Sequence, residues 1–302
     1  MKRGYQLVLL TAVISGFSVF LNSFGVVTLN PYLFTGLKNA IVAAILTGIV
    51  FAASGQETFR GLNKKQWLFL IAIGVIGGGI PFLLFFKGLS LTSAAEASFI
   101  HKSLFIYVAF LASVFLKEKI ERKFIIGAFL LFLGSLFLLK KLPFVFDLGD
   151  LLVATAVLFW AAENVISKYL LKELSAKIIA WGRMFFGTIF IFLFLLLTNQ
   201  IGPLARITFA QFSWIALTSI FLLCYIITWY HGLKDVPVSQ ASAILLLGSP
   251  ITTALSFLAL GKATFGEFLA GVLVIVGVGV IIGIKPRFLT ELRICPRQNL
   301  DS

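Results

Sequence analysis

The sequence predicts an all-α membrane protein with ten transmembrane helices arranged as two inverted five-helix repeats. Three observations support this fold class. The chain of 302 residues is 60% hydrophobic and only 12% charged, whereas about a quarter of the residues of a soluble domain are charged. Ten apolar runs each reach the roughly 20 residues that cross a bilayer. The two halves of the chain also resemble each other at a nearly constant spacing.

The ten apolar runs are separated by short segments that contain turn-forming and charged residues. Backbone groups inside a bilayer must satisfy one another's hydrogen bonds, so we expect each run to form a helix. The alternating pattern of a membrane β-barrel is absent. We interpret the first run as an uncleaved helix, because it is long enough to span and lacks a clear small-x-small cleavage site. The expected helices cover residues 5–25, 32–53, 66–86, 92–115, 122–140, 148–170, 176–197, 211–230, 238–260 and 264–284.

Positive charge is distributed unevenly between the two sides of the predicted membrane domain. If the N-terminus is cytoplasmic, 17 of the 25 Lys and Arg residues lie on the cytoplasmic side, five lie on the opposite side and three lie within apolar runs. The positive-inside rule therefore predicts a multi-pass protein of the inner or plasma membrane with both termini in the cytoplasm. It also explains the net charge of +13 without a nucleic-acid partner.

The two halves align at a lag of 144 residues over a long stretch that needs no gap. Gly88-Leu89 corresponds to Gly232-Leu233, and Lys38 meets Arg183 at a lag of 145. Because each half holds five helices, the second half enters the membrane upside down relative to the first. Inverted repeats of this kind are typical of secondary transporters, whose binding site lies near the midplane between the halves. The expected units are repeat 1 at 5–140, repeat 2 at 149–284 and a solvated basic cytoplasmic tail at 285–302.

The end of the ninth run and the start of the tenth resemble the C-terminal signature of EamA domains in the drug/metabolite transporter superfamily. Pro250 lies in the ninth run, Lys262 lies in a small-residue turn, and glycines follow in the tenth run. The corresponding turn of the first half carries Glu118, where the family usually has Glu. The resemblance covers residues 5–284. It implies a ten-helix carrier of small metabolites, often an exporter of amino acids or related compounds.

Ionisable and polar side chains inside the apolar runs are the candidate site residues. A charged side chain at the centre of a membrane helix costs about 2.5–3.5 kcal/mol on insertion scales, so it generally has a partner or a function. We expect His101 and Lys102 near mid-depth, with Glu96 nearer the outer end of the same helix. The alternatives are an ion pair of Lys102 with Glu96 or Glu163 and an interhelical hydrogen bond of His101. The candidates for the substrate or ion pathway are Glu96, His101, Lys102, Glu163 and Asn164.

A second set of polar residues is expected at the gates or along a cavity. Lys38 and Arg183 are repeat-related cations whose helices run in opposite directions, so we expect them toward opposite sides of the membrane. A packing ion pair is the alternative. The glycines at 77–79 precede Pro81 and permit close helix approach and bending, for a conformational change or for packing alone. The gate or cavity candidates are Lys38, Arg183, Asn22 and Gln240.

The sequence contains no phosphate-binding glycine loop, zinc motif or nucleophile elbow. Cys224 and Cys295 give no disulfide framework and no metal-ligand spacing. We therefore expect no enzyme activity, no cofactor and no metal. The favoured function is secondary active transport of an amino acid or related small polar compound by alternating access. The resemblance favours export, and the simplest coupling ion is a proton carried by Glu96, Glu163 or His101. The alternatives are a passive channel, a lipid-linked metabolite translocator and a membrane-embedded enzyme.

Overall fold

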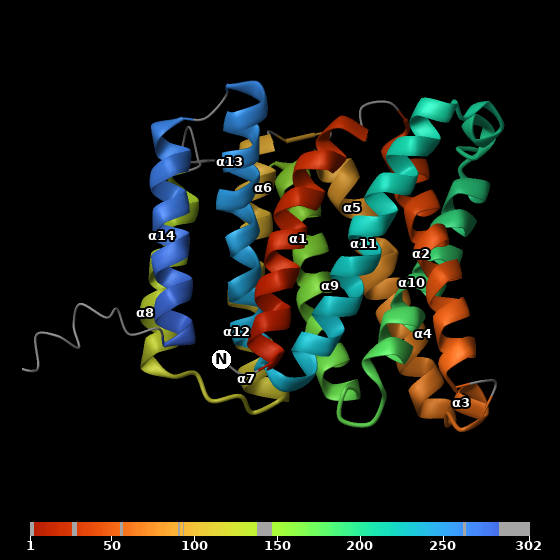
Figure 1. Cartoon of the computed structure of the whole chain (residues 1–302), viewed down its shortest axis with the longest axis horizontal. Coiled ribbons are helices and arrows are strands. Elements are labelled where there is room, and N and C mark those ends of the chain that lie inside the picture. Colours follow the sequence, from red (N-terminus) through yellow and green to blue (C-terminus); the bar gives the residue numbers. More distant parts are fainter. Residues whose placement is uncertain are drawn as a thin grey trace, which may run out of the picture.

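The regular elements of the computed structural model are all helical, and most of them lie side by side along one direction (Figure 1). The structure describes residues 3–25, 29–54, 57–89, 91–92, 94–137, 147–261 and 264–283. Within these ranges, eight helical stretches are long and apolar enough to cross a membrane. They are α1 (Arg3–Gly25), α2 (Pro31–Ser54), α4 with α5 (Lys64–Gly78 and Ile80–Leu89), α9 (Leu148–Leu170), α10 (Ala176–Leu197), α11 (Phe209–Asp235), α12 with α13 (Val238–Ile244 and Gly248–Leu260) and α14 (Phe265–Ile282).

Two further apolar segments complete the ten predicted crossings, and the all-α fold class is confirmed. One is formed by α6 (Ala94–Lys102) and α7 (Leu104–Phe115), and the other is α8 (Arg122–Leu136). Three short elements lie between or within crossings: α3 (Glu57–Arg60), η2 (Gly202–Arg206) and η3 (Leu245–Leu247). The predicted end of the fifth run at 140 and the basic tail at 285–302 lie outside the described residues.

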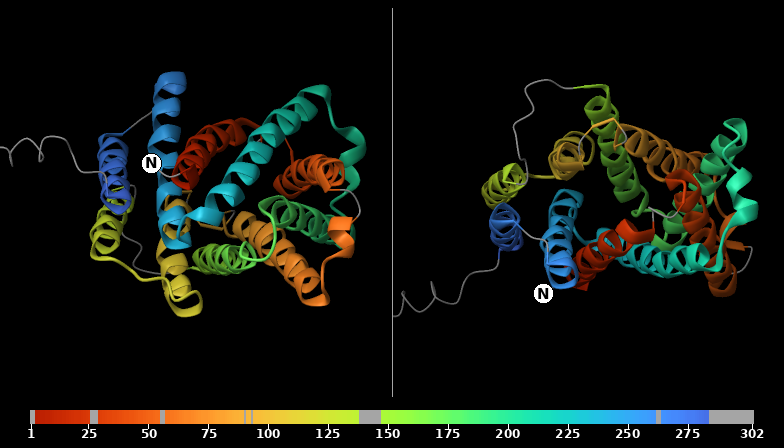
Figure 2. Two further views of the ribbon diagram at one scale, coloured as in Figure 1. Left: turned by 60° about the horizontal axis from the view of Figure 1, so that its bottom comes forward. Right: turned by 90° about the horizontal axis from the view of Figure 1, so that it is seen from above.

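The inverted arrangement of the two halves is visible in the helix directions. In Figure 1, α1 starts at the lower end, where the N-terminus is marked, whereas α9 starts at the upper end and runs the opposite way. The packing partners exchange in the same manner: α1 packs along α11 and α13, and α9 packs along α4, α5 and α7. Two pairs, α2 with α10 and α8 with α14, join a helix to its own counterpart. The α8–α14 pair forms one edge of the molecule (Figure 2).

The third predicted run is not one continuous helix, which corrects the sequence-based expectation. It breaks between α4 and α5 at Gly79, whose φ and ψ are −120° and −85°. Pro81 follows two residues later and has no N–H for the helix ladder. The N–H of Phe82 bonds to the Gly79 carbonyl instead of reaching back four residues. The break therefore leaves the carbonyls of Gly77 and Gly78 without their usual helical partners.

The fourth and ninth runs also break, at corresponding places in the two halves. In the fourth run the helix ends at Lys102, and the Ser103 hydroxyl donates to the Ile100 carbonyl at 2.6 Å. In the ninth run the 3-10 element η3 separates α12 from α13, just before Pro250. A shift of 144 residues maps Lys102 onto Leu246, within η3. Both halves therefore have this break, but only the second half has a proline, Pro250, next to it.

Candidate functional site

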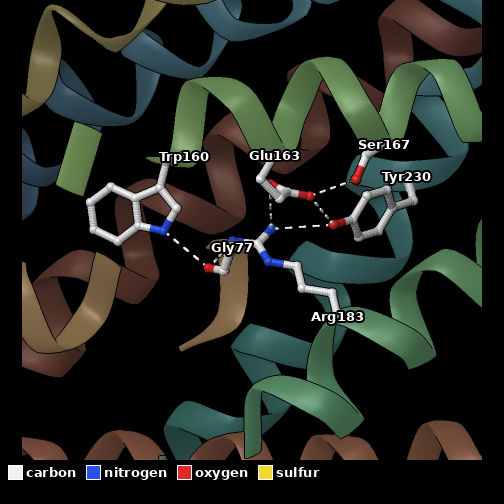
Figure 3. Close-up of polar contacts among 6 residues, drawn as sticks. All are labelled: Gly77, Trp160, Glu163, Ser167, Arg183 and Tyr230. Atoms are coloured by element: carbon white, nitrogen blue, oxygen red, sulfur yellow. Dashed lines mark hydrogen bonds and ion pairs between the residues drawn. The ribbon is translucent and has the colours of Figure 1, made fainter. Parts of the chain in front are cut away.

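A buried carboxylate, a guanidinium and a phenol meet where α9, α10 and α11 approach one another (Figure 3). The Tyr230 hydroxyl donates to Glu163 Oε1 at 2.7 Å. Arg183 Nη1 lies 3.6 Å from Glu163 Oε2, which makes an ion pair, and donates to the Tyr230 oxygen at 3.4 Å. The side chains of Arg183 and Glu163 are 11% and 1% exposed. Opposite charges therefore compensate each other in a region that water barely reaches.

Glu163 is held from its own helix as well. The Ser167 hydroxyl, one turn further along α9, donates to Glu163 Oε1 at 2.6 Å. Oε1 thus accepts two hydrogen bonds, whereas Oε2 has the ion pair but no hydrogen bond among the described residues. A buried charge without its partner costs several kcal/mol. The carboxylate is therefore stable only while Arg183, or another cation, stands beside Oε2.

The carbonyl of Gly77 connects α4 to the charged cluster. Its oxygen accepts from Arg183 Nη2 at 3.3 Å and from Trp160 Nε1 at 3.1 Å. In a regular helix this oxygen would accept from residue 81, which is a proline and has no donor. The adjacent carbonyl of Gly78 accepts from the Asn39 side chain at 3.4 Å. The helix break of the third crossing therefore provides polar acceptors to three neighbouring helices.

The glycines at this break are required for the close approach of α4 to α9 and α10. A Cβ atom added to Gly77 would overlap the side chain of Glu163, and one added to Gly78 would lie 2.6 Å from the Arg183 carbonyl oxygen. Sequence reasoning identified this glycine run only as a flexible or tightly packed segment. Tyr230, Ser167 and the Gly77 carbonyl were not among the candidate site residues selected from the sequence. The Pro81 spacing, four residues after Gly77, is the signal that could have identified the carbonyl.

A related polar cluster surrounds Lys38 in the first half. Lys38 Nζ donates to Asn22 Oδ1 at 2.7 Å and lies 5.1 Å above the ring of Phe34. Asn22 Nδ2 in turn donates to the Ser18 hydroxyl at 3.1 Å. At the lag of 145 residues that relates Lys38 to Arg183, Ser18 and Asn22 correspond to Glu163 and Ser167.

Each half thus has a cation on its second crossing that faces two polar side chains, one turn apart, on its first crossing. Arg183 forms an ion pair with Glu163, whereas Lys38 contacts the neutral Asn22. Both cations lie about 10 Å from the start of their helices, at 1.5 Å per residue. Because α2 and α10 run in opposite directions (Figure 1), Lys38 lies toward the upper end of the molecule and Arg183 toward the lower end.

His101 and Lys102 are adjacent in sequence but face different neighbours. The His101 ring packs edge-on against Phe85 and Trp160, with centroid distances of 5.5 and 5.2 Å. His101 is therefore one side chain away from the Gly77 carbonyl, through Trp160. Lys102 faces a small pocket beside Glu267. The alternative of an ion pair between Lys102 and Glu163 is wrong, because Glu163 pairs with Arg183.

The remaining candidates are not brought together in one place. Asn164 is 6% exposed and follows Glu163 on α9, and its side chain makes no hydrogen bond among the described residues. Gln240 lies near the start of α12, where its Oε1 accepts from the Tyr5 hydroxyl at 2.5 Å. The backbone of Glu96 belongs to α6, but its side chain lies outside the described residues. The functional roles of all these residues stay predictions.

Comparison with known proteins identifies the type of protein that carries this site. The model of the EamA-like transporter family matches residues 2–140 and again residues 147–283. The chain belongs to the EamA-like transporter family. It is therefore a multi-pass membrane transporter, and its resemblance to the drug/metabolite transporter superfamily is confirmed. The two matched ranges cover nearly the whole described part of the chain and lie on either side of the α8–α9 connection.

Relatives of this EamA-family chain support the same conclusion. It is 24% identical over 266 residues to the uncharacterized transporter YyaM of Bacillus subtilis, with 85% of each chain covered. It is 26% identical over 287 residues to an uncharacterized transporter of Archaeoglobus fulgidus, with 92% of this chain and 96% of the relative covered. A crystal structure at 18% identity superposes with a TM-score of 0.76 over 96% of this chain and 98% of the other, which shows the shared fold.

Proposed function

We propose that this transporter is a secondary active carrier of small polar metabolites, of the amino acid class, which works by alternating access. The moving units are the repeats at 5–140 and 149–284. The protein lies in the inner or plasma membrane, with both termini in the cytoplasm. The exchanged packing partners of α1 and α9 support this division. Transport is coupled to the proton gradient and runs outward. Resemblance to exporters within the family supports the outward direction.

The observation that carries the proposal is the ion pair between Glu163 and Arg183. It presents both signs of charge within a membrane-spanning region, with a hydrogen-bonding phenol beside them. An amino acid carries a carboxylate and an ammonium group that match these two side chains. The carboxylate of such a substrate can therefore bind Arg183 while its ammonium group binds Glu163, so that neither buried charge is left unpaired.

The ion pair also lies where movement of one half against the other would affect it. Gly77 comes from the first half, whereas Glu163, Arg183 and Tyr230 come from the second, so the cluster spans the interface between the halves. Exchange of the Arg183 contacts for contacts with a substrate would weaken its bond to the Gly77 carbonyl, which connects the two halves. In an alternating-access carrier, that step opens one side of the site to solution.

The test is flux into liposomes that contain the purified full-length chain, with a mixture of ¹⁴C-labelled amino acids as the probe. We expect uptake above that of empty liposomes, and we expect Glu163→Gln to lower it at least tenfold. Glu121→Gln is the matched control, because Glu121 forms an exposed ion pair with Lys123 at the surface. Uptake equal to that of empty liposomes would overturn the substrate class. Unchanged uptake by Glu163→Gln would overturn the site.

A further inference from the structure

A second pair of opposite charges lies away from the Glu163 cluster, against the α8–α14 edge of the molecule. Lys102, at the end of α6, and Glu267, in the first turn of α14, line the same small pocket. Its other polar lining residues are Ser135 of α8 and Ser249 and Thr253 of α13. The pocket thus combines one ammonium, one carboxylate and three hydroxyl groups in a part of the chain that is otherwise strongly apolar.

The two charged groups do not neutralise each other directly. No carboxylate of the described residues lies within the 4.0 Å ion-pair distance of Lys102. Glu267 Oε2 accepts from the Thr264 backbone N–H at 2.8 Å, as part of the capping box of α14, and Oε1 accepts no hydrogen bond from the described residues. The Ser135 hydroxyl donates to the Leu131 carbonyl at 2.9 Å, so its lone pairs are also available.

The pocket has room for water and for little else. Its volume is about 10 Å³, which is near the lower limit for a single water molecule that has two to four polar partners. A metabolite or a lipid headgroup does not fit. The ligand that suits a site of this size and composition is a proton, carried by an ammonium group and relayed through water and hydroxyl groups.

The lining residues of the pocket come from four helices. Glu267 is in the first turn of α14 and Ser135 is near the end of α8, and both of these helix ends lie at the upper end of the molecule (Figure 1). Lys102 lies about 12 Å along α6 from its upper end, at 1.5 Å per residue. Thr253 and Ser249 are one turn apart on α13 and line the same pocket. The pocket therefore joins Lys102, at the break of the fourth crossing, to Glu267 in the first turn of α14.

We propose that Lys102 is the coupling-proton site of the carrier and that Glu267 exchanges its proton with the solution at the upper end. The Lys102 ammonium releases a proton to water in the pocket and becomes a neutral amine. The Ser135, Ser249 and Thr253 hydroxyls relay the proton to the Glu267 carboxylate, which passes it to the solution, and binding follows the reverse path. This inference rests on the proposed function, because it assigns the proton step of that carrier.

The surroundings of Lys102 are consistent with a group that changes its charge. Glu267 of α14 is the charged residue that faces Lys102 across the pocket, and His101 is its ionisable neighbour on α6. Lys102 also ends α6, at the break that recurs at η3 in the other half. A change of charge at this position therefore alters the attraction between α6 and α14 next to a hinge of the repeat.

The experiment uses liposomes that contain the purified chain, with the pH dye pyranine inside and the ¹⁴C-labelled amino acid mixture as cargo. Two quantities are measured: exchange without a pH gradient, and its stimulation by a one-unit gradient. One proton per cycle can drive at most about tenfold accumulation under that gradient. We expect several-fold stimulation for the wild type and none for Lys102→Met or Lys102→Arg. Arginine keeps the charge but does not release its proton.

Further variants separate the proton path from folding. Thr253→Val removes one relay hydroxyl and keeps both charged groups, so it should reduce the stimulation at least twofold while exchange persists. Glu267→Gln removes the carboxylate and should also reduce the stimulation at least twofold while exchange persists. Lys123→Met and Glu121→Gln remove an exposed ion pair and should match the wild type. If the Lys102 variants do not exchange cargo, the stimulation by the pH gradient in Thr253→Val and Glu267→Gln tests the proton path.

The possible results distinguish this inference from the proposed function. Full stimulation in Lys102→Arg would overturn the proton site and leave the proton-coupled carrier intact. Cargo exchange with no stimulation in the wild type would overturn proton coupling itself, in the proposed function as well as at Lys102. Full stimulation in both Thr253→Val and Glu267→Gln would overturn the relay. A complete absence of wild-type cargo flux would overturn the proposed function itself. Loss of stimulation with retained exchange in the Lys102 variants supports the assignment.

Discussion

Glu163 shows how one side chain in this protein meets the requirements of a charge inside a membrane domain. It is fully buried, and it accepts from the Ser167 and Tyr230 hydroxyls while Arg183 balances its charge. Burying an ion pair gives little net stability, but removing one partner is expensive because the other charge remains in place. The pair therefore acts as a unit, and any process that separates the two side chains must provide replacement partners.

The first prediction concerns this pair. Glu163→Gln leaves Arg183 buried without a counter-charge, so we expect the free energy of unfolding to fall by about 3–5 kcal/mol. The double variant Glu163→Gln/Arg183→Gln should lose less than the sum of the two single variants, because the pair is removed together. Thermal and denaturant unfolding in detergent measure these differences. Strictly additive losses would show that the two side chains do not interact.

Lys38 and Arg183 illustrate how the same cation position differs between the halves. The repeat places each on the second crossing of its half, but Arg183 has a carboxylate partner and Lys38 has an amide and an aromatic ring. The relation between these two positions could be predicted from the sequence. The difference in their partners could not be predicted from the sequence. Which residues of the first crossing contact each cation depends on how the two helices face each other, and only the structure shows this.

At the scale of the element, the third crossing deviates from the expected continuous run at Gly79. Pro81 removes one backbone donor, Gly79 takes an irregular conformation, and the carbonyls of Gly77 and Gly78 turn outward to side chains of neighbouring helices. An unsatisfied carbonyl in a membrane costs several kcal/mol. The break is therefore compatible with the bilayer only because Trp160, Arg183 and Asn39 supply donors.

The second prediction tests the packing at this break. Gly77→Ala introduces a Cβ atom that overlaps the Glu163 side chain, so we expect a lower unfolding temperature and loss of flux. Gly48→Ala is the matched control, because nothing lies within 4 Å of a Cβ at that position of α2. Alanine favours helix by roughly 1 kcal/mol over glycine, so the control should be unchanged or slightly more stable. Equal unfolding temperatures for the two variants would contradict the close approach.

At the scale of the whole molecule, the two halves are joined at the lower end by a carboxylate. Glu118, in the turn between α7 and α8, accepts from the Val238 and Ser239 backbone N–H groups at 2.8 and 3.2 Å and from the Ser239 hydroxyl at 2.7 Å. These groups begin α12, which packs against α7. The bonds connect the two units proposed to move, near the lower end of the molecule in Figure 1.

The third prediction follows from this connection. Glu118→Ala removes three hydrogen bonds between the halves, so we expect the lower end to open more often. Ser242→Cys, in a background without Cys224 and Cys295, reports the opening through its rate of maleimide labelling, because Ser242 is 2% exposed. We expect at least a threefold faster rate. Glu121→Ala is the control, since Glu121 forms an exposed ion pair with Lys123 within the first half, and it should leave the rate unchanged.

Much of the fold could be predicted from the sequence because the bilayer restricts the possibilities. Only helices or closed barrels satisfy the backbone in lipid, so ten apolar runs predict ten crossings. The glycines before Pro81 indicated that the third run could bend, but the sequence did not predict a full helix break at Gly79 or the break at Ser103. A run of apolar residues looks the same whether its helix is straight or broken, and Ser103 has no proline beside it to mark the change.

The sequence by itself determined the membrane environment, the number of crossings, the inverted relation of the halves and the presence of charges within the apolar runs. Only the tertiary structure decided which charges meet: Glu163 with Arg183, and Lys102 beside Glu267. The physical reason is that these helices are apolar on nearly every face, so the pattern of side chains does not show which face turns inward. Partner choice depends on how each helix is rotated against its neighbours, and that is a property of the packed molecule.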